Sequence, residues 1–379
     1  MGATEEKRAW EEYRLAELCA ATSILQSLGY KLDSEQVHIG GERYLMARAR
    51  DVGGGGRKLV LFGRDTKSGA RVVIKVSSDP AGIAEIERER NARALLTKIK
   101  FASHAFFTPR EILFVRRDPF VIAIIEYIEQ ERPFFARPVD EQFFISLHAF
   151  ETQEGVHATT SEHARIIRDT FGMVSAGDYL AQFEEFRRSA TAHDPGNAEL
   201  AETFARAAEF LAQHRTTIER YGGFLTHTDF VPNNLRIRGR DFYLLDYASI
   251  HFGNKYESWA RFTNFMIQHN RPLALALARY VRENRGEEEY LCLRLMRVYK
   301  MGFLLKFYAE ALERAEGPLL ELTRARVAFW IAAAQAVLDD TPLAPEIIEA
   351  YLKRQGELRT PDERQRQREM LGAGQEIRV

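Results

Sequence analysis

The segment from residue 226 to residue 246 constrains the fold of this chain more than any other part. It reads Thr-His-Thr-Asp-Phe-Val-Pro-Asn-Asn, then Leu-Arg-Ile-Arg, Gly-Arg-Asp and Phe-Tyr-Leu-Leu-Asp. Two short runs around a glycine-containing loop predict a β-hairpin. A three-residue loop at positions 239–241 would place Asn234 opposite Asp246, and a bulge would shift that register by one residue.

Three oxygen-bearing side chains of this segment have the spacing of a phosphoryl-transfer site. Such a site needs a carboxylate to accept the proton of the attacking hydroxyl, then an amide and a second carboxylate to hold magnesium. Asp229, Asn234 and Asp246 occur in that order. Cross-strand neighbours have Cβ atoms roughly 5 Å apart, so the hairpin would bring two oxygen ligands together for a hard cation. We predict that Asp229 is the catalytic base and that Asn234 and Asp246 bind the metal.

These residues also have a structural interpretation. Asp and Asn often flank turns because their side chains bond to nearby backbone, but the combined spacing favours the functional interpretation. His227 is a second candidate catalytic residue. It would brace the loop through its ring nitrogens, and the alternative is a hydrogen-bonded interior histidine.

The composition is that of an ordinary soluble protein. The chain has 379 residues, 45% hydrophobic residues and a net charge of -1, which predicts two or three domains and gives no indication of a nucleic-acid or membrane partner. The N-terminus lacks the apolar core of a signal peptide, and no apolar run is long enough to span a bilayer. We therefore expect a cytoplasmic protein.

Strand patterns dominate the first third of the chain, and helical patterns dominate the remainder. The expected elements of the first third are a helix over 5–28, strands over 43–50, 58–62 and 70–76, a helix over 80–100 with Asp79 as N-cap, and strands over 111–116 and 120–128. Helical segments are expected over 137–221 and again after Asp246. The tail after Gly356 is rich in charge and poor in apolar residues, so we expect it to be loosely held.

This order of elements predicts a two-lobed α+β fold. Residues 1–36 would form a helix that packs on the next domain, and residues 37–128 an N-lobe built on a small antiparallel sheet. Residues 129–379 would form a large, mainly helical C-lobe that carries the catalytic loop over 226–234.

A run of four glycines lies between two of the predicted strands. Gly53, Gly54, Gly55 and Gly56 have no side chains to keep an anion away from the backbone amides. A flexible hairpin loop would explain the run equally well. Its position in the N-lobe favours a loop that covers the phosphates of a nucleotide.

Lys75 lies within the strand sequence Arg-Val-Val-Ile-Lys-Val. A lysine in a half-buried strand is disfavoured unless its charge has partners. In a kinase-like lobe those partners are nucleotide phosphates and a glutamate of the following helix. Glu85 and Glu89 share one face of that helix; we favour Glu89, with Glu85 as the alternative. The predicted strand over 120–128 would lead into the hinge between the lobes. Backbone groups of this hinge, from Glu126 to Ile128, would bind adenine.

With these residues the chain resembles the aminoglycoside phosphotransferase and choline kinase family, small-molecule kinases with a protein-kinase-like fold. The resemblance covers roughly residues 37–260. Its firmest signature is His227-Thr228-Asp229, Asn234 and Leu245-Asp246. It implies ATP and Mg²⁺ as cofactors, with Asp229 as base, Asn234 and Asp246 as magnesium ligands, and Lys75 on the ATP phosphates.

The chain departs from that family's pattern after Asp246. The family commonly continues with Gly-Asp-Pro and then an Asp that opens the next helix, whereas residues 253–260 read Gly-Asn-Lys-Tyr-Glu-Ser-Trp-Ala. Ser258 can cap that helix, but it offers no carboxylate to brace the catalytic loop. The departure bears on the identity of the substrate more than on the chemistry.

The expected activity is transfer of the γ-phosphoryl group of ATP to a hydroxyl of an aminoglycoside-, choline- or sugar-like molecule. The alternative is a nucleotide-binding protein of the same fold that has lost catalysis and acts through protein contacts. A protein kinase is disfavoured because no Ala-Pro-Glu motif follows Asp246.

Two groups of residues bear on the acceptor. Several acidic residues could attract a polycation, but we interpret them mostly as solvated side chains on helix faces. They are Glu287 to Glu289, Glu310, Glu313, Asp339 and Asp340. Aromatic residues that could line a pocket for a choline-like cation are by default core residues: Trp259, Phe262 and Phe265.

Overall fold

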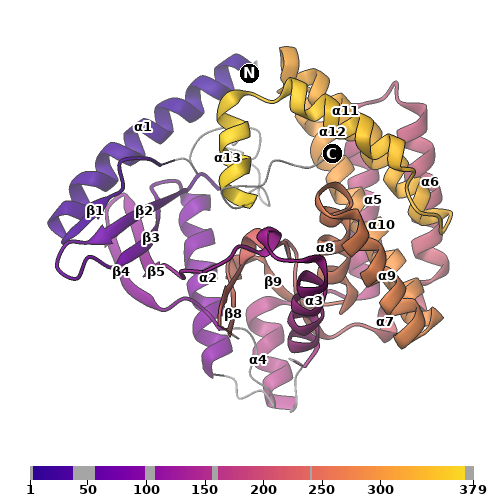
Figure 1. The fold of residues 1–379 in the computed structure, drawn as a ribbon, viewed down its shortest axis with the longest axis horizontal. Coiled ribbons are helices and arrows are strands. Elements are labelled where there is room, and N and C mark those ends of the chain that lie inside the picture. The colour runs from indigo at the N-terminus through magenta and orange to yellow at the C-terminus, as the bar shows by residue number, and fades with distance from the viewer. Residues whose placement is uncertain (1–2, 37–55, 99–106, 156–160, 240, 372–379) are drawn as a thin grey trace.

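The computed structural model describes residues 3–36, 56–98, 107–155, 161–239 and 241–371. They form two lobes, with a five-stranded antiparallel sheet on one side and a larger, mainly helical body on the other (Figure 1). The predicted two-lobed α+β fold is confirmed.

The sheet of the small lobe has the strand order β1-β2-β3-β5-β4, and all neighbouring strands are antiparallel. Its strands are β1 (Tyr30–Leu32), β2 (Leu59–Asp65), β3 (Arg71–Ser77), β4 (Glu111–Arg117) and β5 (Phe120–Glu126). Four of them match predicted strands. The strand expected over 43–50 lies outside the described residues, and β1 is an edge strand that the sequence pattern did not predict.

The first helix, α1 (Ala3–Ser27), packs on one face of this sheet. Trp10 and Leu25 of the helix are buried together with Leu61 and Ile74 of the strands. In β3 the buried apolar side chains alternate along the strand, and this alternation leaves the intervening Lys75 on the opposite face. That opposite face is the one directed toward the large lobe.

The helix α2 (Pro80–Lys98) starts where its N-cap residue predicts. The Asp79 carboxylate accepts a hydrogen bond from the backbone N–H of Gly82 at 3.0 Å. A Cβ atom added to Gly56 would lie 2.0 Å from that same nitrogen. The end of the glycine run is therefore pressed against the first turn of α2, where no larger residue fits.

The large lobe combines two short β-ribbons with many helices. The ribbon strands are β6 (Phe224–His227), β7 (Leu235–Arg238), β8 (Asp241–Leu244) and β9 (Ile250–Gly253). The helices are α3 (Val139–Glu154), α4 (Ser161–Phe171), α5 (Ala176–His193), α6 (Ala198–Gln213), α7 (Arg215–Arg220), α8 (Tyr256–His269), α9 (Arg271–Arg285), α10 (Glu287–Leu312), α11 (Gly317–Leu338), α12 (Pro345–Leu358) and α13 (Pro361–Leu371). The expected breaks near Gly155, Gly172 and Pro195 separate successive helices.

The helix α10 is central to this lobe and packs against α5, α8, α9 and α11. Aromatic rings fill the space between α3 and α8, where Phe150 stacks on Trp259 with ring centroids 4.0 Å apart. Trp259 and Phe262 are fully buried, so their default interpretation as core residues is confirmed.

The end of the chain differs from the expectation of a loose tail. The structure continues α12 to Leu358 and adds α13, which lies between α1 and the helical lobe in Figure 1. Glu363 of α13 is buried and binds Arg366 through two hydrogen bonds. Ion pairing within the helix thus supports a segment that has few apolar residues.

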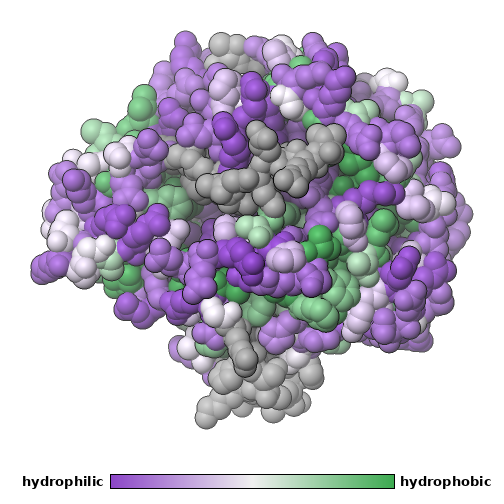
Figure 2. Space-filling view, in the orientation of Figure 1, coloured by the Kyte–Doolittle hydropathy of each residue, from purple (hydrophilic) through white to green (hydrophobic). Residues whose placement is uncertain are grey.

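The surface is largely hydrophilic on the face shown in Figure 2, with hydrophobic side chains gathered over α3. The exposed hydrophobic residues of α3 are Val139 and Phe144. Among the described residues, no helix has the length and apolar character needed to cross a bilayer.

Two helical glycines offer a test of this packing. A Cβ at Gly302 of α10 would lie 2.3 Å from the buried ring of Phe183, whereas a Cβ at Gly356 of α12 would meet nothing within 4 Å. We expect Gly302→Ala to lower the free energy of unfolding by roughly 1–2 kcal/mol, because overpacking outweighs the gain in helix propensity. Gly356→Ala, the matched control, should raise it by about 0.5–1 kcal/mol in urea unfolding. A stabilised Gly302→Ala protein would contradict the tight α5–α10 contact.

Candidate active site

The predicted catalytic segment forms a strand, a loop and a hairpin. Its hairpin pairs Arg238 with Asp241 and Leu235 with Leu244. The connecting loop is therefore two residues long, and Gly239 adopts the positive φ of 61° that such a tight turn favours. Asn234 consequently lies opposite Leu245, and the predicted pairing with Asp246 is wrong by one residue.

The segment nevertheless faces a cavity of about 410 Å³ between the sheet and the large lobe. Its lining includes most of the residues selected from the sequence: Gly56, Lys75, Glu89, Glu126, Ile128, Asp229, Asn234 and Asp246. His227 does not line this cavity, and its ring contacts the backbone of the catalytic loop instead. Gly53, Gly54 and Gly55 lie outside the described residues.

Two buried lysines on the sheet pair with two glutamates of α2. Lys75 binds Glu89, and Lys58 binds Glu85. Burial alone lowers the pKa of an ammonium, but the carboxylates of Asp246, Glu85 and Glu89 raise the pKa of Lys58 above its usual value. Lys58 is therefore positively charged beside the cavity.

Lys58 was missed by the sequence reasoning, although a signal for it exists. It precedes Val60 and Phe62 by two and four residues, and side chains at alternate positions of a strand share one face. All three line the cavity. Lys58 is the first residue of the strand predicted over 58–62, so the alternation along that strand would have identified it.

Asp246 is a carboxylate on which both of these lysines act. Its backbone is left-handed, with φ 58° and ψ 57°, and Ser249 donates a hydrogen bond to its Oδ2 at 2.8 Å. Burial would raise the pKa of Asp246, but Lys58 and Lys75 bring it down to about 2. Its Oδ1 is buried, and the described residues provide no hydrogen-bond donor for it.

Asn234 is fixed against Asp229. Its Nδ2 donates to the Asp229 carbonyl at 2.8 Å and to the Asp229 carboxylate at 3.2 Å. This orientation makes the amide oxygen the atom that can reach a cation. The ionised carboxylate with a buried, unbonded oxygen and the nearby amide oxygen fit a hard cation such as magnesium.

His227 has contacts on both ring nitrogens. Nδ1 accepts a hydrogen bond from the backbone N–H of Asp229 at 3.2 Å, and Nε2 lies 3.1 Å from the carbonyls of Leu245 and Asp246. Burial lowers the pKa of His227, which favours the neutral ring with the proton on Nε2. The ring thus links the loop before Asp229 to the turn that carries Asp246.

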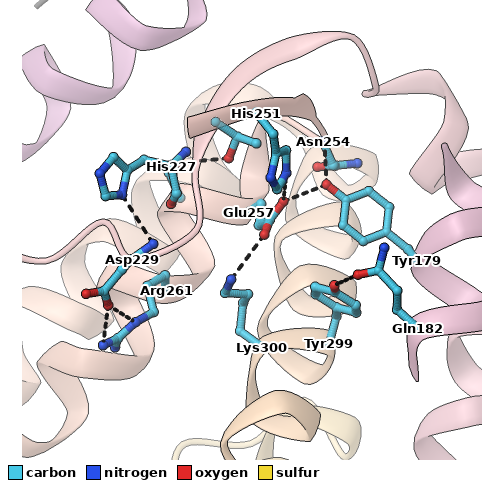
Figure 3. A network of polar contacts seen from close by, with 12 residues as sticks. Tyr179, Gln182, His227, Asp229, His251, Asn254, Glu257, Arg261, Tyr299 and Lys300 are labelled. Atoms are coloured by element: carbon cyan, nitrogen blue, oxygen red, sulfur yellow. Dashed lines mark hydrogen bonds and ion pairs between the residues drawn. The ribbon is translucent and has the colours of Figure 1, made fainter. Parts of the chain in front are cut away.

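Asp229 is half exposed, with 46% of its side chain accessible. Arg261 of α8 donates to Oδ1 from Nε at 2.9 Å and approaches it with a second guanidinium nitrogen at 2.7 Å (Figure 3). A carboxylate has about four acceptor positions, so these contacts leave room for a further hydrogen bond. Arg261 was not identified from the sequence, because it lies thirty-two residues from Asp229 and belongs to no motif.

Ser258 does not cap α8, because the helix starts at Tyr256 with Lys255 as the flanking residue. The buried Ser258 hydroxyl instead accepts hydrogen bonds from the His227 backbone N–H at 2.8 Å and from Gln153 at 2.9 Å. It also contacts the hydroxyl of Thr226 at 2.9 Å. A hydroxyl therefore braces the catalytic loop where we expected no brace.

A buried carboxylate lies next to Ser258 in the sequence. Glu257 accepts hydrogen bonds from Tyr179 at 2.6 Å and Lys300 at 3.1 Å, and contacts His251 at 2.8 Å (Figure 3). Burial raises the pKa of a carboxyl group, but His251 and Lys300 hold the pKa of Glu257 well below its usual value. The network joins α5, β9, α8 and α10 behind the catalytic loop.

The hinge after β5 is arranged at one end of the cavity. Glu126, Tyr127 and Ile128 line it, but the backbone N–H of Glu126 already donates to the Arg110 carbonyl at 2.9 Å. The Glu126 carboxylate contacts Arg238 at 3.3 Å. The backbone N–H and the carboxylate of Glu126 are therefore both engaged within the protein.

Comparison with solved structures identifies the fold. The chain matches a thermostable mutant of aminoglycoside phosphotransferase APH(4)-Ia, solved as a ternary complex with AMP-PNP and hygromycin B, with a TM-score of 0.52. The match is 14% identical and covers 77% of this chain and 94% of the other. An aminoglycoside phosphotransferase from Alicyclobacillus acidocaldarius matches at 15% identity over 80% and 94% of the two chains, with a TM-score of 0.49.

The resemblance predicted from the motifs is thus confirmed at the level of the fold. No protein-family model matches the chain, and no curated protein matches it.

The brace at Ser258 can be tested by removing its hydroxyl. Ser258→Ala would leave the His227 N–H and the Gln153 amide without this acceptor, so we expect a loss of about 1–3 kcal/mol in unfolding free energy. Thr263→Ala is the matched control in α8, because the buried Thr263 hydroxyl donates to the carbonyl of Trp259 in its own helix. Equal losses in both variants would contradict a special role for Ser258.

The Glu257 network predicts an acid-sensitive stability. Because the pKa of Glu257 is lower in the folded protein than its ordinary 4.5, its contribution is complete above pH 4.5 and is lost as the pH falls below it. We expect Glu257→Gln to lower the free energy of unfolding by about 3–5 kcal/mol at pH 7, because buried Lys300 loses its carboxylate partner. Below pH 4.5 the free energy of unfolding of this variant should depend less steeply on pH than that of the wild type. Urea unfolding at several pH values measures both, and the exposed Glu349→Gln is the control. If the free energy of unfolding of Glu257→Gln fell as steeply below pH 4.5 as that of the wild type, this account would be contradicted.

Proposed function

We propose that this chain, which has the fold of the aminoglycoside phosphotransferases, is an ATP-dependent phosphotransferase that acts on a hydroxyl of a small molecule. The observation that carries the proposal is the convergence of Lys75, Asp229, Asn234 and Asp246 on one cavity between the lobes. Lys75 comes from β3 of the sheet, and the other three come from the segment 226–246 of the large lobe. Their gathering around a single space supports a shared chemical role.

In this proposal the nucleotide occupies the cavity with its adenine near the hinge at Tyr127 and Ile128. Lys75, held by Glu89, binds the phosphates as a fixed positive charge. Lys58 adds a second positive charge on the same face of the sheet. The glycine run that ends at Gly56 covers the phosphates with backbone amides.

Asn234 and Asp246 would hold magnesium, which supplies charge neutralisation at the transferring phosphoryl group when it is bound. Asp229 orients the acceptor hydroxyl and takes its proton at the carboxylate. Arg261 and Asn234 fix that carboxylate from two sides, and His227 fixes the loop beneath it. We therefore assign Asp229 as the catalytic residue and His227 as a positioning residue.

The proposed acceptor is an aminoglycoside-, choline- or sugar-like alcohol. The structural neighbour named above binds hygromycin B, an aminoglycoside. A panel of hydroxylated amines, sugars and antibiotics, screened for ATP consumption, would identify which alcohols are accepted.

The catalytic assignment is tested by Asp229→Asn, which keeps the size of the side chain and removes the base. We expect ATP-dependent transfer to fall by roughly 10²–10⁴-fold while AMP-PNP binding is kept. Asp169→Asn, at an exposed position of α4, is the matched control and should transfer at the wild-type rate.

A second pair separates nucleotide binding from base catalysis. Lys75→Met should weaken AMP-PNP binding, whereas Lys67→Met in the exposed β2–β3 turn should not. If the wild type binds AMP-PNP but shows no magnesium-dependent ATP turnover with any alcohol, the alternative of a non-catalytic nucleotide-binding protein would replace the proposed function.

A further inference from the structure

Arg236 is a partly buried cation in the cavity between the lobes. It belongs to β7, two residues beyond Asn234, and it lines the cavity. Its Nη1 donates hydrogen bonds to the carbonyls of Asn233 at 3.0 Å and Leu235 at 2.8 Å. Burial lowers the pKa of Arg236, and the effect of Tyr127 opposes this. The guanidinium still stays protonated, because its pKa starts from 12.5.

The other cations in the described part of the lining are paired with carboxylates. They are Lys58 with Glu85, Lys75 with Glu89 and Arg366 with Glu363. Arg236 has no carboxylate partner among the described residues, and its hydrogen bonds go to backbone carbonyls. A charge held away from bulk water without a partner costs free energy, and natural proteins retain such a cost mainly at functional sites. The unpaired charge therefore indicates that a ligand completes the contacts of Arg236.

The guanidinium of Arg236 has donors to spare. A guanidinium carries five N–H groups, and Nη1 directs its two to the backbone. The other three belong to Nε and Nη2, which have no hydrogen-bond partner within the described segments, yet neither nitrogen is sealed off from solvent. Because the cavity is the space that Arg236 lines, a ligand in the cavity can reach these groups.

The course of β7 places Arg236 between the two ends of the cavity. Asn234, at the start of the strand, lies with Asp246 at the end that fits a metal ion. Arg238, at the other end of the strand, contacts Glu126 of the hinge at 3.3 Å. Since a strand rises about 3.3 Å per residue, Arg236 lies roughly 7 Å along the chain from each end. A nucleotide with phosphates at the metal and base at the hinge would cross Arg236 with its nucleoside.

The face of the sheet that lines the cavity changes from charged to apolar in the same direction. Val60 is the cross-strand partner of Lys75, and Val73 precedes Lys75 by two residues, so all three share that face. Val73 pairs with Ile125, which lies next to Glu126 of the hinge. The sheet thus offers a lysine to the phosphates and valines to the part of the ligand nearer the hinge.

A flat aromatic group matches a site with valines on one side and a guanidinium on the other. The planar guanidinium of an arginine stacks on aromatic faces and is attracted to their π electrons. The protein already contains such a contact at the hinge, where the guanidinium carbon of Arg71 lies 4.0 Å from the ring centroid of Tyr127. The base is the aromatic part of a nucleotide.

From these observations we infer that Arg236 binds the nucleoside by stacking its guanidinium on the base, which would lie between Arg236 and the valines of the sheet. The inference rests on the proposed function in taking the ligand of this cavity as a nucleotide. It adds affinity at the base, which the phosphate-binding lysines do not supply. The competing interpretation is that Arg236 only ties together the backbone of residues 233–235.

Calorimetric titration of the full chain with magnesium separates the two ends of the ligand. Adenosine probes the base and ribose without phosphate charge, and tripolyphosphate probes the phosphate end alone. We expect Arg236→Met to weaken adenosine roughly three- to thirtyfold, the range of a cation–π contact, and tripolyphosphate within about twofold. Lys75→Met should do the reverse, because Lys75 would contact only phosphate.

Two further measurements refine the test. 2′,3′-Dideoxyadenosine lacks the ribose hydroxyls, and Arg236→Met should weaken it as much as adenosine if the contact is to the base. Arg279→Met, at an exposed position of α9, is the control and should bind every probe as the wild type does. If Arg236→Met does not fold, Arg236→Lys decides by the same comparison, because it keeps the charge and removes the plane.

Three results would overturn the inference. An equal loss of adenosine and tripolyphosphate affinity would show a disturbed loop, and unchanged adenosine affinity would show no contact. A loss for adenosine but not for dideoxyadenosine would show that Arg236 binds the ribose hydroxyls instead of the base.

The inference and the proposed function fail separately. ATP-dependent transfer to an alcohol by the wild type, with unchanged adenosine affinity in Arg236→Met, would end the inference and leave the proposed function. Nucleoside binding that depends on Arg236, without ATP turnover on any alcohol, would leave the inference and end the proposed function.

Discussion

Charge compensation in the space between the lobes is the constraint on which the site depends. Lys58 and Lys75 come from the sheet, Glu89 from α2 and Asp246 from the large lobe, and all are largely removed from water. A buried charge without a partner costs several kcal/mol, so each of these groups needs the others to remain ionised. The cluster therefore fixes the sheet, the helix and the hairpin turn relative to one another, and it fixes them in the arrangement that brings positive charge to the cavity.

Behind this cluster, the catalytic loop is held by short polar contacts and not by apolar packing alone. His227 ties the loop to the turn at Asp246, and Ser258 ties it to α3 and α8. Glu257 extends the same support to α5 and α10. These buried and bonded groups therefore support the loop that carries Asp229 without lining the cavity itself.

Features that depend on neighbouring residues could be predicted, and features that depend on distant ones could not. The alternation in β3, the Asp79 cap and the spacing from Asp229 to Asp246 are local patterns, and each predicted its element. The hairpin register was wrong because sequence alone did not distinguish a two-residue from a three-residue loop at Gly239. The contact of Arg261 with Asp229 joins α8 to the catalytic loop, and no periodicity within one helix reports how separate segments pack.

The close approach of Gly56 to the first turn of α2 has a mechanical consequence. Backbone atoms that touch without intervening side chains cannot slide past each other freely, so the end of the glycine loop and the start of α2 must move together. That helix also carries Glu89, the partner of Lys75. In the proposed function, a displacement of Gly56 by an arriving nucleotide would therefore also displace the first turn of α2, and with it the helix that holds Glu89 against Lys75.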